Sequence, residues 1–139
     1  MKKYLYLIFP LLLLLLDQYL KYLAARGTFS AGEILTYACN PHISWSIPLK
    51  GSLFWLLWLT TISGLIFYLR INPRNIFLLL VLSGAISNLY DRITAGCVLD
   101  YINLGFFPVF NLADVAITAG ALSFLLSQFK EKNNHTHNA

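Results

Sequence analysis

A chain of 139 residues in which 58% are hydrophobic and only 12% are charged is too apolar for an ordinary soluble domain, where about a quarter of residues are charged. Its formal net charge of +4 does not indicate a nucleic-acid-binding protein, because the Lys and Arg residues lie between apolar runs instead of gathering on one face or tail. Composition therefore predicts a single small membrane domain over 1–139 that binds no nucleic acid.

The first apolar segment, at about 4–24, follows a basic N-terminus and resembles a secretory signal peptide. A signal peptide would end in a small-residue cleavage site, whereas DQYLKYLAARG continues the helical pattern. We therefore predict a retained transmembrane helix. Asp17 and Lys21 are four residues apart and share one face of it, so they either form an internal ion pair or take part directly in a polar site.

The connection at 25–51 contains short alternating stretches such as EILTYA, which predict strands lying on the membrane surface. It also contains Cys39, which has no metal-ligand spacing with the distant Cys97. The two cysteines can pair in an oxidising compartment, but we favour two free cysteines. Nucleophilic catalysis by His42 and Ser46 is not favoured, because the segment offers no third member of a triad.

Two further apolar segments, at about 52–70 and 75–92, predict transmembrane helices joined by the short connection LRINPRN. So short a connection makes them antiparallel neighbours. Asn72 is predicted to cap the second of these helices, with Pro73 at its first position.

The last ten residues of the 75–92 helix, SGAISNLYDR, include several small and polar residues. Gly84 favours close helix packing, and Asn88, one turn later, can donate and accept hydrogen bonds. For Asp91 and Arg92 the structural interpretation is that both side chains reach the membrane interface. Arg92 can instead hold a substrate carbonyl or an anionic headgroup.

A turn-rich connection at 93–108 contains Asp100 and leads into a fourth predicted helix at about 109–129, which contains Asp114. Both residues are anchored at the same membrane surface, so we expect their carboxyl groups to lie close together. Two close carboxyl groups share a proton and supply an acid and a base, as in aspartic proteases. The alternative is structural: Asn111 and Asp114 match a helix N-cap followed by an acid, and Asp100 would be a solvated loop acid.

The distribution of charge predicts the topology of the chain. By the positive-inside rule, both termini lie in the cytoplasm, together with the basic residues Lys2, Lys3, Arg70, Arg74, Lys130 and Lys132. Most acids fall in the outer half, namely Asp17, Glu33, Asp91, Asp100 and Asp114. The candidate site is therefore expected at the outer face.

Three motifs together resemble the lipoprotein signal peptidases, the signal peptidase II family: DQYLK at 17–21, SNLYDRITAGCVLDYI at 87–102 and PVFNLADVAITAG at 108–120. The resemblance covers nearly the whole chain. It implies an all-α membrane protein, a bundle of four transmembrane helices with a small extracytoplasmic β-sheet between the first two. It also implies an aspartic endopeptidase of the bacterial cytoplasmic membrane that needs no cofactor or metal. Such an enzyme cuts prolipoproteins just before a cysteine carrying a diacylglyceryl thioether.

The resemblance also assigns roles to residues. The family's catalytic aspartates correspond to Asp100 and Asp114, and its structural acid corresponds to Asp91. Its substrate-binding or supporting residues correspond to Asn88, Arg92, Asn111, Asn40, Asp17 and Lys21. The chain departs from the family in NPHISWS at 40–46 and in SGAISN at 83–88, so the edge of the substrate site is expected to differ.

Two other functions remain open at this point. A small ion-coupled transporter would spread acids through the depth of the bundle, whereas here only Asp17 is expected to lie deep. A catalytically inactive relative that binds lipoproteins is suggested by the altered NPHISWS segment. For the peptidase, we expect lipidated prolipoprotein substrates, contact with membrane lipid, a monomeric state, and a signal helix lying against the small-residue face of the 75–92 helix.

Overall fold

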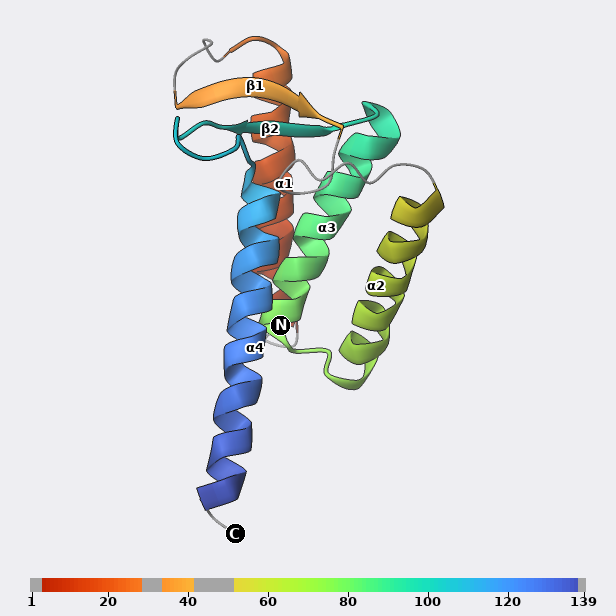
Figure 1. Ribbon diagram of the computed structural model, residues 1–139, viewed down its shortest axis with the longest axis vertical. Helices are drawn as coiled ribbons and strands as arrows, with labels where there is room; N and C mark the ends of the chain where they lie inside the picture. The colour runs from red at the N-terminus through yellow and green to blue at the C-terminus, as the bar shows by residue number, and fades with distance from the viewer. Residues whose placement is uncertain (1–3, 29–33, 42–51, 138–139) are drawn as a thin grey trace.

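The computed structural model describes residues 4–28, 34–41 and 52–137, and within them it has four helices and one two-stranded sheet. The helices are α1 (Leu5–Ala25), α2 (Ser52–Ile71), α3 (Ile76–Thr94) and α4 (Leu112–His137), and the strands are β1 (Leu35–Asn40) and β2 (Val98–Ile102). Figure 1 shows α1 and α3 running towards the sheet and α2 and α4 running away from it, so the start of α1 and the end of α4 lie opposite the sheet. The first three predicted helices agree with the structure to within two residues.

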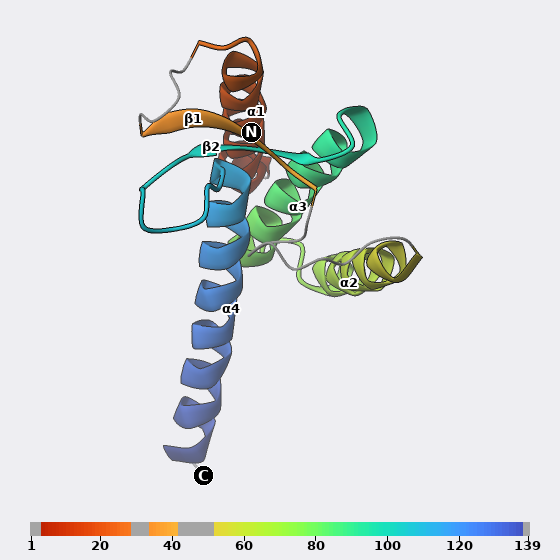
Figure 2. The same cartoon turned by 45° about the horizontal axis from the view of Figure 1, so that its top comes forward.

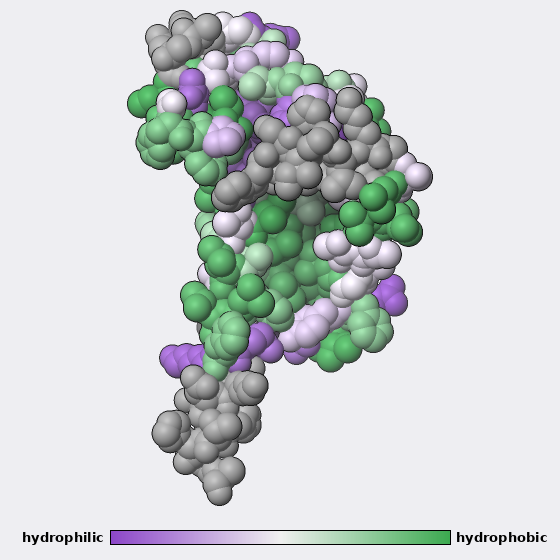
Figure 3. Space-filling model, viewed as in Figure 1, coloured by the Kyte–Doolittle hydropathy of each residue, from purple (hydrophilic) through white to green (hydrophobic). Residues whose placement is uncertain are grey.

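The surface of the helices is apolar. Among the described residues, α1, α3 and the Leu112–Lys130 part of α4 are long and apolar enough to cross a bilayer, while the apolar stretch of α2, Trp55–Ile71, is shorter. Figure 3 shows hydrophobic residues over the middle of the molecule, with hydrophilic residues gathered above and below. A soluble protein would not expose so large an apolar surface, so the chain is a multi-pass membrane protein.

Close packing of α3 against α4 depends on two glycines. A Cβ atom at Gly84 would overlap the carbonyl oxygen of Ala113, and one at Gly120 would lie 2.5 Å from the carbonyl oxygen of Phe77. Figures 1 and 2 show α3 beside α4, and α2 contacts α4 where Tyr68 packs edge-on against Phe124, with the ring centroids 5.5 Å apart. The predicted packing role of Gly84 is confirmed, because only glycine lets the two backbones approach this closely.

We expect Gly84→Ala to lower the free energy of unfolding by about 1–3 kcal/mol, the usual cost of overpacking. The added methyl group must push α4 away from α3. Gly64→Ala is the matched control, since a Cβ at Gly64 in α2 meets nothing within 4 Å. Thermal unfolding in detergent should show a lower midpoint for the Gly84 variant only; equal midpoints would contradict the packing argument.

The sheet joins the two long connections. β1 and β2 are antiparallel, with Ala38 opposite Asp100 and Asn40 opposite Val98. The predicted strand in EILTYA is therefore confirmed, and among the described residues it pairs with a segment outside 25–51. Its partner, β2, comes from the connection predicted to be only turn-rich. A strand's local pattern shows that it can pair, but the helices decide which other segment is brought to its edge.

The two cysteines form a disulfide. Cys39 and Cys97 are bonded, with their Cα atoms 5.6 Å apart, so the prediction of two free cysteines is wrong. The register of the sheet explains the pairing: Cys39 lies opposite Leu99 and Asn40 lies opposite Val98, so Cys97, which directly precedes Val98, lies diagonally across the same end of the two strands from Cys39. The cysteines are 58 residues apart in sequence, and spacing alone gave no indication of this pairing.

The connection between α2 and α3 is capped differently from the prediction. Asn75, not Asn72, is the N-cap of α3, and its side chain accepts a hydrogen bond from the Leu78 N–H at 3.2 Å. The Asn72 carbonyl instead accepts a hydrogen bond from the Asn75 N–H at 3.1 Å. This contact closes a turn with Pro73 at its first central position, where proline is favoured.

Candidate active site

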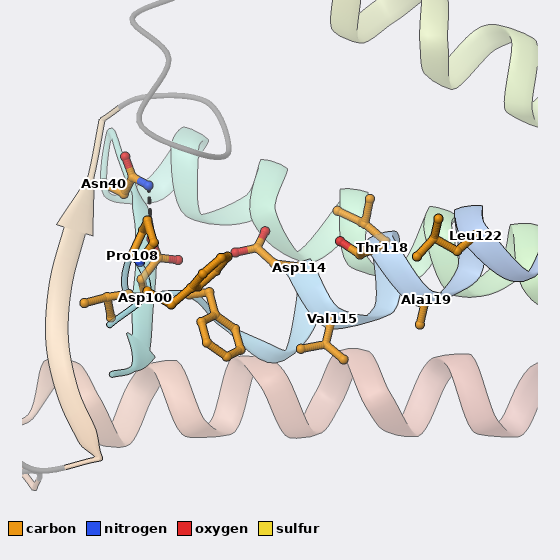
Figure 4. Close-up of a pocket in the computed structure, with 12 residues that line it drawn as sticks. Asn40, Asp100, Pro108, Asp114, Val115, Thr118, Ala119 and Leu122 are labelled. Carbon is orange, nitrogen blue, oxygen red and sulfur yellow. Dashed lines mark hydrogen bonds between the residues drawn. The ribbon is translucent and has the colours of Figure 1, made fainter. Parts of the chain in front are cut away.

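Two carboxyl groups line one cavity below the sheet. Asp100 lies in the middle of β2, and Asp114 lies in the first turn of α4. Both line a cavity of about 400 Å³ (Figure 4). We call these two residues the carboxyl pair. Asp100 is buried and Asp114 is half-buried, so the structure brings together the two acids that the sequence singled out.

Asn111 connects the two members of the carboxyl pair. Its side-chain Nδ2 donates to Asp100 Oδ1 at 2.7 Å, and its Oδ1 accepts from the Asp114 backbone N–H at 2.8 Å. The Asn111 backbone N–H also points at Asp114 Oδ2, at 3.4 Å. This reciprocal arrangement is a capping box, so the predicted N-cap is confirmed, and it holds both acids in place at the same time.

The fourth helix accordingly begins later than predicted. It starts at Leu112, three residues after the expected start, because Phe110 still pairs with Ile102 beside the sheet. Phe110 is thus still paired beside the sheet, and the cap at Asn111 sets where the helix begins. Asp114 therefore lies at the level of the sheet, next to β2.

Two more asparagines complete the hydrogen bonding of the pair. Asn40 at the end of β1 donates from Nδ2 to Asp100 Oδ2 at 3.1 Å, the contact drawn in Figure 4. Asn88 on α3 donates from Nδ2 to Asp114 Oδ1 at 2.8 Å. Each of the four carboxyl oxygens therefore faces a donor, which fixes the orientation of both groups.

Burial raises the pKa of Asp100 to about 6, and the charge of Asp114 raises it further, while hydrogen bonds from Asn40 and Asn111 and the charge of Lys21 oppose the rise. A carboxyl group with such a pKa holds a proton under conditions where an exposed one is ionised. Because the charge of Asp114 contributes to the rise, ionisation of one carboxyl group disfavours ionisation of the other.

A buried cluster of three charged side chains, Lys21, Asp17 and Asp91, contacts Asn88 through Lys21, and Asn88 in turn binds Asp114. Lys21 Nζ lies 2.7 Å from Asp17 Oδ2 and 2.7 Å from Asp91 Oδ2, and the Lys21 and Asp17 side chains are 1% and 0% exposed. The predicted internal ion pair is thus confirmed. Lys21 Nζ also donates to Asn88 Oδ1 at 2.9 Å. This contact turns the Asn88 amide so that its Nδ2 faces Asp114.

Asp91 does not reach the membrane interface, as its helix-end position had suggested. It is 2% exposed, and its carboxylate binds Lys21, accepts from Gln18 Nε2 at 2.9 Å and accepts from the Leu99 N–H at 3.2 Å. These partners supply the hydrogen bonds that a buried carboxylate would otherwise need from water. Asp91 therefore joins α1, α3 and β2, a structural role. Arg92, the next residue, donates to the Asn88 carbonyl at 3.2 Å and interacts electrostatically with the carboxyl pair.

Tyr101 is a site residue that the sequence reasoning missed. Its hydroxyl donates to Asp17 Oδ1 at 3.0 Å and accepts from the Leu112 N–H at 3.1 Å. The side chain is 1% exposed, and a buried tyrosine hydroxyl usually has a hydrogen-bond partner. The available signal was its position directly after Asp100. Neighbouring residues of a strand point to opposite faces, so Tyr101 points away from the Asp100 side of the strand and reaches Asp17 on α1. Gln18, inside the DQYLK motif, was likewise overlooked.

We expect Tyr101→Phe to lower the free energy of unfolding by about 1–3 kcal/mol, since it removes a donor to the buried Asp17 carboxylate and the acceptor of the half-buried Leu112 N–H. The matched control is Tyr90→Phe, because Tyr90 is exposed on α3. Chemical or thermal unfolding in detergent measures the difference. A Tyr101 variant as stable as the Tyr90 variant would show that the hydroxyl contributes nothing.

The altered NPHISWS segment lies mostly beyond the part that the structure describes. Asn40 is described, whereas His42, Trp45 and Ser46 fall in 42–51, outside the described residues. Within the described ranges, no group of three or more His, Cys, Asp or Glu side chains is arranged to hold a metal ion. The site that can be described consists of carboxyl groups and their hydrogen-bond donors.

Comparisons with known proteins agree on one family. A family model described as Signal peptidase (SPase) II matches residues 9–130. A Lipoprotein signal peptidase of Caldanaerobacter subterraneus is 36% identical over 121 residues, covering 77% of this chain and 83% of that one. One of Pseudomonas fluorescens is 41% identical over 112 residues, but the match spans 66% of its length, slightly under two thirds. A solved structure titled as a bacterial membrane enzyme aligns with a TM-score of 0.77 and 26% identity over 93% of this chain and 90% of that one.

Proposed function

The chain belongs to the signal peptidase II family, and we propose that it is an aspartic endopeptidase that removes signal peptides from diacylglyceryl-modified bacterial prolipoproteins. The observation that carries the proposal is the carboxyl pair, two acids from different elements that line one cavity and are connected by Asn111. This is the arrangement that acid–base hydrolysis of a peptide bond requires.

In the proposed mechanism the pair holds one proton. The ionised carboxylate takes a proton from water as the water oxygen attacks the scissile carbonyl carbon. The protonated carboxyl group donates its proton to the carbonyl oxygen. The resulting tetrahedral intermediate collapses, the C–N bond breaks, and a proton passes to the leaving amine. Asn40, Asn88 and Asn111 keep the two groups in register through this cycle.

The cavity supports entry of an apolar substrate from the bilayer. Beyond Asp114 it continues along α4, where its lining is mainly apolar and includes Val115, Ala119 and Leu122 (Figure 4). The signal helix lies along this surface while the acyl chains stay in lipid. The small-residue face of α3, where we expected the signal helix, is instead filled by α4 at Gly84.

We propose that α2 is the fourth membrane span and that the protein acts as a monomer in the bacterial cytoplasmic membrane. Both termini then lie in the cytoplasm and the sheet lies outside, as the positive-inside rule predicts. The Cys39–Cys97 disulfide supports this orientation, because disulfides persist in oxidising compartments outside the cytoplasm.

The decisive experiment compares two substrates. The purified protein is incubated with a diacylglyceryl-modified precursor and with the same precursor lacking the lipid, and cleavage is followed as a mobility shift. We expect cleavage of the lipidated precursor only, just before its modified cysteine. Binding without cleavage would indicate an inactive lipoprotein-binding relative, and cleavage of both precursors would overturn the proposed specificity.

Acid–base catalysis by the carboxyl pair predicts how the rate depends on pH. Below its pKa the pair keeps a shared proton and can act as an acid; above it both groups are ionised and the acid is lost. Because the pKa of Asp100 is raised to about 6, kcat/KM should fall as pH rises through about 6, since this parameter reports the free enzyme. A kcat/KM that keeps rising through this range would contradict the assignment.

A further inference from the structure

The disulfide lies one residue away from a hydrogen-bond donor to the carboxyl pair. Cys39 directly precedes Asn40, the last residue of β1, and Cys97 directly precedes Val98, the register partner of Asn40. Asn40 Nδ2 donates to Asp100 Oδ2 at 3.1 Å. The covalent bond therefore joins the two strand ends next to this donor and acceptor.

The two strands are held to the helices to different degrees. β2 is tied to α3 by the Leu99 N–H contact with Asp91 and to the start of α4 by the pairing of Ile102 with Phe110. β1 has six residues, pairs only with β2 among the described strands, and has a register irregularity between Leu35 and Ala38. A two-stranded ribbon is only marginally stable, so the end of β1 depends on what fastens it.

We propose that the Cys39–Cys97 disulfide is a positioning element for catalysis, which holds Asn40 against Asp100 and makes full activity depend on an oxidising compartment. This inference rests on the proposed function. Its effect on the carboxyl pair passes through Asn40, which is neutral. The charged groups that face Asp100 come from the other elements, Lys21 from α1, Arg92 from α3 and Asp114 from α4, and reduction of the disulfide alters none of their charges.

The bond can be opened by a dithiol reagent, because Cys39 is exposed while Cys97 is buried. A thiolate of the reagent attacks the disulfide and forms a mixed disulfide, and its second thiol then displaces the protein. The protein gains two electrons and two protons and ends with two thiols, while the reagent becomes a cyclic disulfide. No other reactant is needed.

The test measures kcat/KM against pH for the full chain in detergent, with lipidated precursor, before and after treatment with dithiothreitol. We expect reduction to lower kcat/KM about tenfold, the equivalent of losing one hydrogen bond to a carboxylate. Because the Asn40 amide favours the ionised form of Asp100, loosening it raises the pKa of the pair. The decline of kcat/KM at high pH should therefore move upwards, by about half a unit or more.

Two variants separate positioning from general stability. Cys39→Ser/Cys97→Ser should match the reduced enzyme and should not respond to dithiothreitol. Asn40→Ala should show the same loss and the same upward movement of the pH profile, and reduction should add nothing further. If reduction leaves both kcat/KM and the pH profile of the wild type unchanged, the inference is wrong. It is also wrong if reduction lowers the rate of Asn40→Ala by a further tenfold.

A measurement that does not need cleavage keeps the two proposals distinguishable. Infrared titration of ¹³C-labelled aspartate, with Asp100→Asn subtracted, follows ionisation of Asp100 in the oxidised and reduced forms. A higher pKa in the reduced form supports the positioning of Asn40 even if no precursor is cut, in which case only the proposed function fails. An unchanged pKa overturns the inference, even where the oxidised enzyme is active.

Discussion

Asp100→Asn is expected to abolish cleavage of the lipidated precursor, with kcat falling by about 10³-fold or more, because an amide can neither take nor give the proton that the reaction requires. The change is nearly isosteric and leaves the Asn111 donor facing a side-chain oxygen at Oδ1. Burial raises the pKa of Asp100, so the fold disfavours the ionised acid, but the amide nitrogen of the variant faces the Asn40 Nδ2 donor and offsets this gain; we expect stability to change by no more than about 1 kcal/mol. Single-turnover cleavage together with thermal unfolding measures both effects.

Asp114→Asn is the companion variant, and the double variant is the control. Groups that act as one unit are not additive, so the double variant should be no slower than either single variant. A double variant that is slower by the product of the two single effects would mean that the carboxyl groups act independently. A single variant that retains most of the wild-type kcat would remove the basis for the proposed mechanism.

Lys21→Met is expected to lower the free energy of unfolding by about 3–5 kcal/mol, the cost of leaving buried charges without their partner. Lys21 Nζ contacts both Asp17 and Asp91 at 2.7 Å, and neither carboxylate is more than 2% exposed. The loss should also reach the site, since Asn88 Oδ1 loses the Lys21 donor and keeps only the longer contact with Asn111 Nδ2, at 3.2 Å. Denaturant or thermal unfolding in detergent gives the free energy, and the cleavage assay gives the effect on rate.

Two further variants serve as a control and as a rescue for Lys21→Met. Lys130→Met removes a Lys that is exposed on α4 and should change stability by no more than about 0.5 kcal/mol. Adding Asp17→Asn and Asp91→Asn to Lys21→Met removes the unpaired charges and should restore part of the lost stability. If Lys21→Met is as stable as Lys130→Met, the cluster does not hold the helices together.

The candidate site was partly predictable because some of its geometry is local. Asp17 and Lys21 share a helix face through their spacing of four, and Asn111 and Asp114 form a capping box through their spacing of three, so both contacts follow from helix geometry alone. Asp100 was paired with Asp114 because both are anchored at the same membrane surface, and the family motif added the catalytic role. That Asp100 and Asp114 line one cavity needed the positions of β2 and α4 together.

The sequence by itself determined the apolar helices and the two local contacts within them, because hydrophobic runs and helix periodicity act over a few residues. Only the tertiary structure decided that β1 pairs with β2, that Cys39 meets Cys97, and that Tyr101 joins Asp17 to the start of α4. The sheet pairing, the disulfide and the Tyr101–Asp17 contact connect residues 58 to 84 positions apart. They form because the packing of α1, α3 and α4 brings their segments to the same end of the bundle, and no short pattern records which segments will meet there.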